Sequence, residues 1–184
     1  MRAPLIALLA LGLLDGARPA GADGLFWLKP EWSTVRERIR KEYPAVPQLA
    51  TRDLAAWLAA KDRAKPLLLD VRTWQEFATS HLAGAQRVDP DAKPAQLDLR
   101  VAKDQPIVTY CSVGYRSSAM AARLRAAGFT NVQNLEGSIF QWANEDRPLV
   151  SDGEPTKTVH PFNASWGHLL KPEHRGPMVG PNKP

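Results

Sequence analysis

Residues 106–118 read PIVTYCSVGYRSS and contain Cys111, the single cysteine of the 184-residue chain. The first five residues form a short, β-branched run, which is typical of a strand in a protein core. Gly114 then allows the positive φ of a sharp turn, and Met120 and Leu124 share one face of a following helix. The stretch therefore predicts a buried strand, a tight loop and a helix, with the cysteine where the strand ends.

Such a loop suits a reactive thiol. Several backbone N–H groups of a strand–loop–helix turn can converge on one point. Arg116 and the helix N-terminus add positive potential, which lowers the pKa of a thiol and makes it nucleophilic at neutral pH. We therefore interpret Cys111 as an activated thiolate; an inert buried thiol and a thiol that pairs with another molecule are the alternatives. No metal is predicted, because a lone cysteine and four scattered histidines do not form a zinc pattern.

Strands and helices alternate on both sides of this stretch. Residues 67–71, LLLDV, form a short apolar run that is typical of a strand buried on both faces. Further strands are expected at 86–88 and 132–135, and helices at 74–79 and 138–144. The pattern predicts an α/β domain with a central, mostly parallel sheet and helices on both faces.

A helix is also expected ahead of this domain. Apolar residues recur there at steps of three and four residues: Trp32, Val35, Ile39 and Tyr43. We place Pro30 at the first helical position and expect Thr51 to cap the next short helix. The other face of the first helix is charged and is interpreted as its solvated face, with contact to an anionic surface as the alternative.

The N-terminus resembles an export signal. Met1 and Arg2 form a short positive start, Leu5–Leu14 is free of charge, and Ala20-Gly21-Ala22 offers a small-residue cleavage site. The apolar run of ten residues is too short for a bilayer core, which needs about 20. We predict a cleaved signal peptide over residues 1–22, a periplasmic or otherwise exported protein and no stable membrane insertion afterwards. An uncleaved anchor or a buried strand is the alternative.

The C-terminal segment, residues 151–184, loses all periodicity and is rich in proline and glycine. It still contains large apolar side chains, including Phe162 and Trp166, so we expect its first half to pack on the domain and its last ten or so residues to be loose. The chain is therefore divided into a signal peptide (1–22), an N-terminal helical lead-in (23–46), a domain (47–150) and this tail (151–184).

Three segments resemble the rhodanese family in the family's order. Residues 110–118 are similar to the active loop of single-domain bacterial rhodaneses. Residues 69–72 (LDVR), followed by Glu76-Phe77 and by residues 81–85 (HLAGA), resemble the signature near the first core strand. Residues 134–142 (NLEGSIFQW) resemble the closing segment. The resemblance covers about residues 47–150 and implies a rhodanese-like fold.

The resemblance also implies an activity. Cys111 would take sulfane sulfur from a donor such as thiosulfate, hold it as a persulfide and pass it to a small thiol or an acceptor protein, with no cofactor beyond that covalent intermediate. Four residues separate Cys111 from Arg116, as in the sulfur-transferring members, whereas the related phosphatases and arsenate reductases have one more. The loop has no further Lys or Arg, so a persulfide donor fits as well as thiosulfate.

The predicted site combines a catalytic cysteine, a loop that binds the persulfide and a set of supporting residues. The role of Arg116 stays open between binding a substrate anion and bracing the loop. Ser117 is expected either to cap the helix or to donate to the persulfide. Glu76 is expected to join a buried pair of Asp70 and Arg72. The full set is Cys111; Ser112, Val113, Gly114, Tyr115, Arg116 and Ser117; and Asp70, Arg72 and Glu76.

Composition excludes few other functions. The net charge of +5 is a mild basic excess without aromatic residues arranged around it, so no nucleic-acid partner is predicted. Two competing hypotheses remain beside sulfur transfer. One is a non-catalytic rhodanese-like module that binds a partner, and the other is a redox or oxyanion-reducing enzyme that needs a resolving thiol from another protein.

Overall fold

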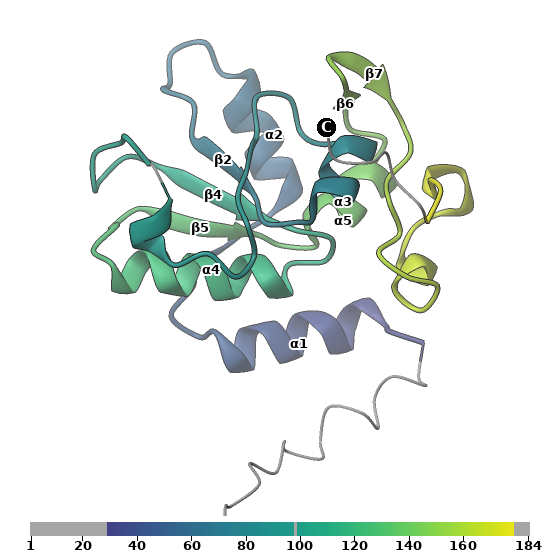
Figure 1. Ribbon diagram of the computed structural model, residues 1–184, viewed down its shortest axis with the longest axis horizontal. Helices are drawn as coiled ribbons and strands as arrows, with labels where there is room; N and C mark the ends of the chain where they lie inside the picture. The colour runs from purple at the N-terminus through teal and green to yellow at the C-terminus, as the bar shows by residue number, and fades with distance from the viewer. Residues whose placement is uncertain (1–28, 98, 179–184) are drawn as a thin grey trace, which may run out of the picture.

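The computed structural model describes residues 29–97 and 99–178, and its centre is a parallel β-sheet (Figure 1). The predicted signal peptide lies outside the described residues. Five strands pair in the order β1-β5-β4-β2-β3, and every pairing is parallel. The strands are β1 (Gln48–Leu49), β2 (Leu67–Asp70), β3 (Gln86–Arg87), β4 (Ile107–Tyr110) and β5 (Val132–Leu135). The predicted α/β class with a central parallel sheet is confirmed.

Helices flank this sheet. The α-helices are α1 (Trp32–Glu42), α2 (Thr51–Ala59), α3 (Trp74–Thr79), α4 (Tyr115–Ala126) and α5 (Ser138–Asn144). Short 3-10 helices follow at Pro94–Gln96, Trp166–Leu169 and Pro172–His174. Among the described residues, no helix combines the length and the apolar character that a membrane span needs.

Two apolar clusters lie on the two faces of the sheet because successive strand residues point to opposite sides. Leu68 and Val108 belong to one cluster, together with buried residues of α2 and α5. Leu69 and Ile107 belong to the other, together with the buried side of α4. Strands covered on both faces read as unbroken apolar runs, which is why residues 67–71 and 106–110 have that composition.

Two details of the helix starts differ from the predictions. Pro30 is not the first residue of α1: Glu31 has extended backbone and its carbonyl accepts the first helical hydrogen bond, from Val35. Thr51 does not cap α2, because it is already the first helical residue. Its hydroxyl donates to the Glu145 carboxylate, at 2.7 Å.

The C-terminal segment is built into the domain further than predicted. Strands β6 (Leu149–Ser151) and β7 (Glu154–Thr156) form an antiparallel hairpin that the sequence pattern did not reveal and that crosses the predicted boundary after Val150. Beyond it, Val159, Leu170 and His174 are buried. The Val159 backbone is bonded by both His174 and Gly176, so ordered packing continues past the first half of the tail.

We predict that the tail unfolds together with the domain. Leu170→Ala removes a side chain that is 1 % exposed and packed in the cluster of α2 and α5, and should reduce the free energy of unfolding by about 2–5 kcal/mol. Met178→Ala, at 56 % exposure, should change it by less than about 0.5 kcal/mol. Urea unfolding followed by circular dichroism measures both. A Leu170→Ala variant as stable as the wild type would show that the tail is not part of the core.

Candidate active site

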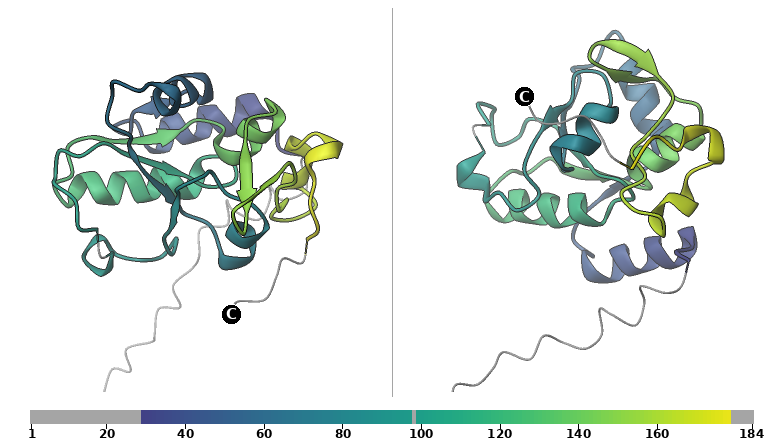
Figure 2. Two further views of the ribbon diagram at one scale, coloured as in Figure 1. Left: turned by 90° about the horizontal axis from the view of Figure 1, so that it is seen from above. Right: turned by 45° about the vertical axis from the view of Figure 1, so that its right-hand side comes forward.

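The candidate site lies at the edge of the sheet where its parallel strands end. β4 ends at Tyr110, Cys111 follows, and α4 begins at Tyr115. Helix α3 follows β2, and α5 follows β5, so their N-termini meet at the same edge. Figures 1 and 2 both show α3, α5 and the tail gathered at this end of the molecule. The predicted strand–loop–helix arrangement around the cysteine is confirmed.

The loop between β4 and α4 folds back on the cysteine. Gly114 has φ +111 and lies directly before α4, a conformation that strains any other residue. A Cβ at this position would also lie 3.2 Å from the Asn134 side-chain nitrogen and 3.4 Å from Ile39 Cδ1. In this turn the Gly114 N–H donates to Cys111 Sγ, at 3.2 Å. Glycine is therefore required both by the backbone angle and by the space.

The turn before α5 holds the cysteine from the other side. The Cys111 N–H donates to Ser138 Oγ at 3.2 Å, and the Cys111 carbonyl accepts from the Ile139 N–H. The Phe140 N–H donates to the Ser112 carbonyl. The backbone around the sulfur is thus fixed by the first turn of α5 as well as by α4. Ser138 is a site residue that sequence reasoning missed, although its place after Gly137 at a helix start was visible.

Cys111 is 1 % exposed, and burial alone would raise the pKa of its thiol. Three influences outweigh burial and place that pKa below its ordinary value: the charge of Arg116, hydrogen bonds from Ser117, and the Gly114 N–H. The Ser117 hydroxyl has one hydrogen, which its 2.6 Å contact gives to Asn134 Oδ1, so it must turn to reach the sulfur. The loop around Cys111 therefore favours the thiolate form, which agrees with the lowered pKa expected from the sequence.

Arg116 and Glu76 form the strongest contact of the site. Arg116 Nη1 and Nη2 donate to the two Glu76 oxygens at 2.9 and 2.7 Å, and Nη2 also donates to Ser112 Oγ at 3.0 Å. The Ser112 hydroxyl in turn donates to Glu76, at 2.8 Å. Burial would raise the Glu76 pKa, but the pairing with Arg116 dominates and lowers it to about 2. Arg116 therefore braces the loop, one of the two roles predicted for it, and the binding of a substrate anion stays a prediction.

Glu76 also fixes α3 against the loop. Its Oε2 accepts from the Thr73 N–H and hydroxyl, both at 3.0 Å, while the Glu76 N–H donates to Thr73 Oγ1. This reciprocal capping box starts α3. One carboxylate thus caps the N-terminus of α3, binds an arginine and accepts from the Ser112 hydroxyl. Glu76 was expected to join Asp70 and Arg72. Its two oxygens accept hydrogen bonds from Arg116 instead, while Arg72 acts on it through its charge.

Asp70 and Arg72 form a separate buried pair. Arg72 Nε and Nη2 donate to the Asp70 carboxylate at 2.8 and 2.6 Å, and Nη2 also donates to the Ser80 carbonyl. Both side chains are 0 % exposed. Their charge is neutralised next to the site, and they connect the end of β2 to the end of α3. This is the structural role that was predicted for them.

The remaining loop residues serve packing. Val113 is buried in the cluster of α2 and α5, together with Ile39 of α1. The Tyr115 ring meets the Tyr43 ring edge-on at 5.7 Å, and its hydroxyl donates to Glu42. Ser117 does not cap α4, because it lies in the third helical position and bonds to Asn134. Helix α1 therefore supports the loop, a contact that its apolar spacing alone did not indicate.

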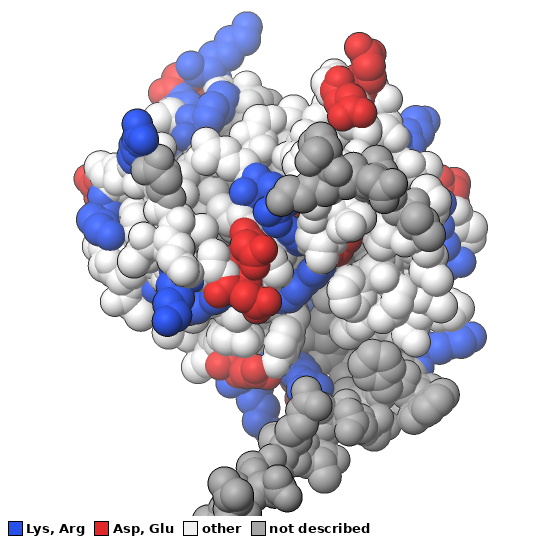
Figure 3. Space-filling model, viewed as in Figure 1, with Lys and Arg blue, Asp and Glu red and all other residues white. Residues whose placement is uncertain are grey.

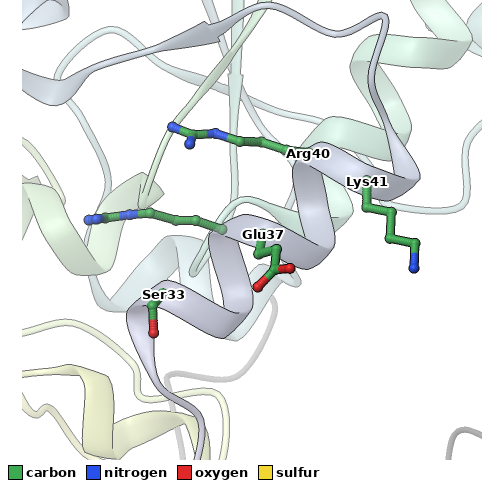
Figure 4. Close-up of a pocket in the computed structure, with 5 residues that line it drawn as sticks. Ser33, Glu37, Arg40 and Lys41 are labelled. Atoms are coloured by element: carbon green, nitrogen blue, oxygen red, sulfur yellow. The ribbon is translucent and has the colours of Figure 1, made fainter.

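A hollow beside α1 is distinct from the cysteine site (Figure 4). It is lined by Ser33, Arg36, Glu37, Arg40 and Lys41. Arg36 donates to Gln141, and Arg40 donates to Glu136, each at 2.5 Å. These arginines tie α1 to α5 and to the turn before it. On the face drawn in Figure 3, basic and acidic side chains are interspersed rather than gathered by sign.

Side chains of several histidines contact backbone carbonyls. His81 Nδ1 contacts the Phe77 carbonyl at 3.0 Å, and His174 Nδ1 contacts the Lys157 carbonyl at the same distance. Within residues 29–97 and 99–178, no three His, Cys, Asp or Glu side chains lie together as metal ligands would. The chemistry that this site offers is therefore that of a single nucleophilic thiolate surrounded by hydrogen-bond donors.

We predict that the reactivity of Cys111 depends on the charge of Arg116. The rate of alkylation by iodoacetamide should titrate with a pKa below that of a free cysteine. Arg116→Met removes the positive charge and should move this titration to higher pH, whereas Arg116→Lys keeps the charge and should move it less. Intact mass over a pH series measures both variants, with circular dichroism as the check on folding. An unshifted Arg116→Met profile would contradict this assignment.

A second prediction concerns acid stability. The Glu76 pKa is lowered from 4.5 to about 2, so its stabilising contribution is complete above about pH 4.5 and is lost as the pH falls to about 2. Glu76→Gln should cost about 3–5 kcal/mol at pH 7, because it leaves Arg116 without its charged partner. That cost should shrink with acidification. Urea unfolding at several pH values tests this, with the exposed Asp53→Asn as control. A cost that does not change with pH would refute the account.

Comparisons with known proteins agree with this geometry. A family model described as the rhodanese-like domain matches residues 52–145. The tRNA uridine(34) hydroxylase of Erwinia tasmaniensis is 30 % identical over 124 residues, which cover 61 % of this chain and 35 % of that protein. The probable adenylyltransferase/sulfurtransferase MoeZ of Mycobacterium tuberculosis is 32 % identical over 102 residues, which cover 54 % and 25 %. The chain thus spans about a third or less of these relatives.

Solved structures share the fold. The solution structure of the rhodanese-like domain of the Anabaena sp. Alr3790 protein has a TM-score of 0.52 at 25 % identity, covering 57 % of this chain and 79 % of that one. The BH2092 protein of Bacillus halodurans has a TM-score of 0.52 at 21 % identity, covering 74 % and 97 %. The matched family model spans just over half of the chain and includes Cys111, Arg116 and Glu76, so this chain belongs to the family of rhodanese-like domain proteins.

Proposed function

We propose that this protein is a sulfurtransferase that carries sulfane sulfur as a persulfide on Cys111. The observation that carries the proposal is the lowered pKa of a buried thiol whose sulfur accepts the Gly114 N–H and lies in the field of Arg116. The relative MoeZ, named as a probable adenylyltransferase/sulfurtransferase, supports the class of reaction. The matched region covers about a third of the relatives named as hydroxylases, so a hydroxylase activity is not part of this proposal.

The reaction has two displacement steps. The Cys111 thiolate attacks the outer sulfur of thiosulfate or of a persulfide, and sulfite or a thiolate leaves with the electron pair of the broken S–S bond. The terminal sulfur then lies among the backbone N–H groups of residues 112–117, which stabilise its negative charge. An acceptor thiolate or cyanide attacks that sulfur, and the Cys111 thiolate is released.

Loop length favours sulfur over oxyanion chemistry. Arg116 donates three of its five N–H groups to Glu76 and Ser112, which leaves Nε–H and one Nη1–H, so the arginine alone does not separate the two chemistries. The related phosphatases and arsenate reductases have one residue more before the arginine, which widens the loop for a tetrahedral oxyanion. A persulfide needs only the backbone donors, so the shorter loop fits sulfur better than phosphate.

We further propose that the protein is exported, on the strength of residues 1–22. In an oxidising compartment an accessible thiolate would form disulfides or be over-oxidised. The 1 % exposure of Cys111 protects it from adventitious reagents. A partner that supplies or removes sulfur is therefore part of the proposal, with a small thiol or a protein cysteine as the acceptor.

The test is intact mass of the protein after thiosulfate or glutathione persulfide, beside Cys111→Ser. The wild type should gain about 32 Da, the mass of one sulfur, and lose it again with cyanide, while the serine variant should gain nothing. Protein with a free thiol that gains no mass from either donor would refute sulfur transfer. That result would favour the competing hypothesis of a rhodanese-like module that binds a partner without catalysis.

A further inference from the structure

One aromatic side chain of the tail lies at the active loop. The Phe162 ring centroid is 4.9 Å from Arg116 Cζ, a cation–π contact. Phe162 is 43 % exposed, and it is one of two large apolar residues among the described positions that face solvent. It belongs to the C-terminal segment, beyond residues 52–145 of the family model. The contact is therefore an addition to the common domain.

Contacts within the tail fix the position of the Phe162 ring. Phe162 has φ +64, a left-handed conformation that a bulky residue adopts only under constraint. The Phe162 N–H donates to His160 Nδ1 at 3.1 Å, and the other ring nitrogen of His160 donates to the Met178 carbonyl at 2.6 Å. His160 is buried, and the preceding Val159 is part of the core. These contacts hold Phe162 in place against its backbone preference.

Arg116 is the part of the loop that solvent reaches beside the Phe162 ring. From Cys111 to Ser117, all residues are buried except Tyr115 and Arg116. The Arg116 side chain is 25 % exposed. Because Tyr115 lies against α1, we take the surface of Arg116, with the Phe162 ring next to it, as the entrance for a reagent from solvent.

The chemistry of that entrance is partly apolar. Glu76 forms an ion pair with Arg116 and accepts one hydrogen from each of its Nη atoms, and Phe162 covers the guanidinium. An inorganic dianion such as thiosulfate meets a paired rather than a free positive charge there. A donor that carries an organic group beside its sulfane sulfur can place that group against the Phe162 ring.

We propose that Phe162 is a specificity-determining residue that favours organic sulfane-sulfur donors over inorganic thiosulfate. The proposal rests on sulfur transfer by Cys111. With an organic thiosulfonate, the Cys111 thiolate attacks the terminal sulfur, the S–S bond breaks, and the sulfinate leaves with its electron pair. Cyanide then removes the sulfur as thiocyanate and regenerates the thiolate, so charge and atoms balance without an added oxidant or reductant.

Two thiosulfonates isolate the contribution of the ring. Benzenethiosulfonate and methanethiosulfonate carry the same charge and the same leaving chemistry, and differ in the organic group. The wild type should show the higher kcat/KM for benzenethiosulfonate. Phe162→Ala should reduce the ratio of the two kcat/KM values about fivefold, chiefly through KM for the aromatic donor. Phe162→Leu, which keeps apolar surface, should fall between, and thiosulfate turnover should not decrease.

Met178→Ala is the matched control. It shortens the other exposed apolar side chain of the tail and leaves the Met178 carbonyl available to His160. Its donor ratio should equal that of the wild type. An unchanged ratio in Phe162→Ala would overturn the proposal. Equal losses in both variants would also overturn it, because they would show a general loosening of the tail.

A second readout does not depend on sulfur transfer. Alkylation of Cys111 by N-benzyliodoacetamide and by iodoacetamide requires only a nucleophilic thiol and tests the same entrance. The preference for the benzyl reagent should fall about fivefold in Phe162→Ala and stay unchanged in Met178→Ala. A protein that alkylates with this pattern but transfers no sulfur would refute the proposed function and keep the role of Phe162. An equal preference in wild type and Phe162→Ala would refute that role.

Discussion

The pair of Arg116 and Glu76 is the contact on which the site depends. A buried charge pair contributes only when its geometry is good and its remaining hydrogen bonds are made. Here Glu76 receives both Nη atoms of Arg116, the Ser112 hydroxyl and the cap of α3. Two segments distant in the sequence, the start of α3 and the loop of residues 112–116, are thereby fixed around one carboxylate. The pair also holds the Arg116 guanidinium close to Cys111, where its positive charge lowers the pKa of the thiol.

Much of this arrangement could be predicted from sequence. Two apolar runs, at 67–71 and 106–110, predict buried strands. The glycine in the loop predicts a sharp turn after the second strand, with the cysteine where that strand ends. The partner of Glu76 could not be predicted, because Arg116 is 40 positions away and only the parallel register of β2 and β4 brings them together. The ordered packing of the tail was underestimated, because its elements are a hairpin of three-residue strands and isolated bridges, which are too short to leave a periodic pattern.

The two ends of the chain act on the same loop. Helix α1 packs behind Gly114 and Tyr115, and its arginines reach the turn before α5 and α5 itself. The tail places Phe162 on Arg116 from the solvent side. The part of the fold that the family model matches supplies the cysteine and its donors, and these additional segments pack against the same loop. In our proposal, this division lets a common loop serve a particular donor.

The central claim is that Arg116 braces the ring while backbone N–H groups hold the transferred sulfur. A crystal structure of the protein after reaction with a sulfur donor tests this most directly. The account predicts an additional sulfur on Cys111 that accepts hydrogen bonds from backbone N–H groups of residues 112–117, with Arg116 still bound to both oxygens of Glu76. An Arg116 that has left Glu76 to bind the terminal sulfur, or a sulfur that lies outside the ring, would contradict it.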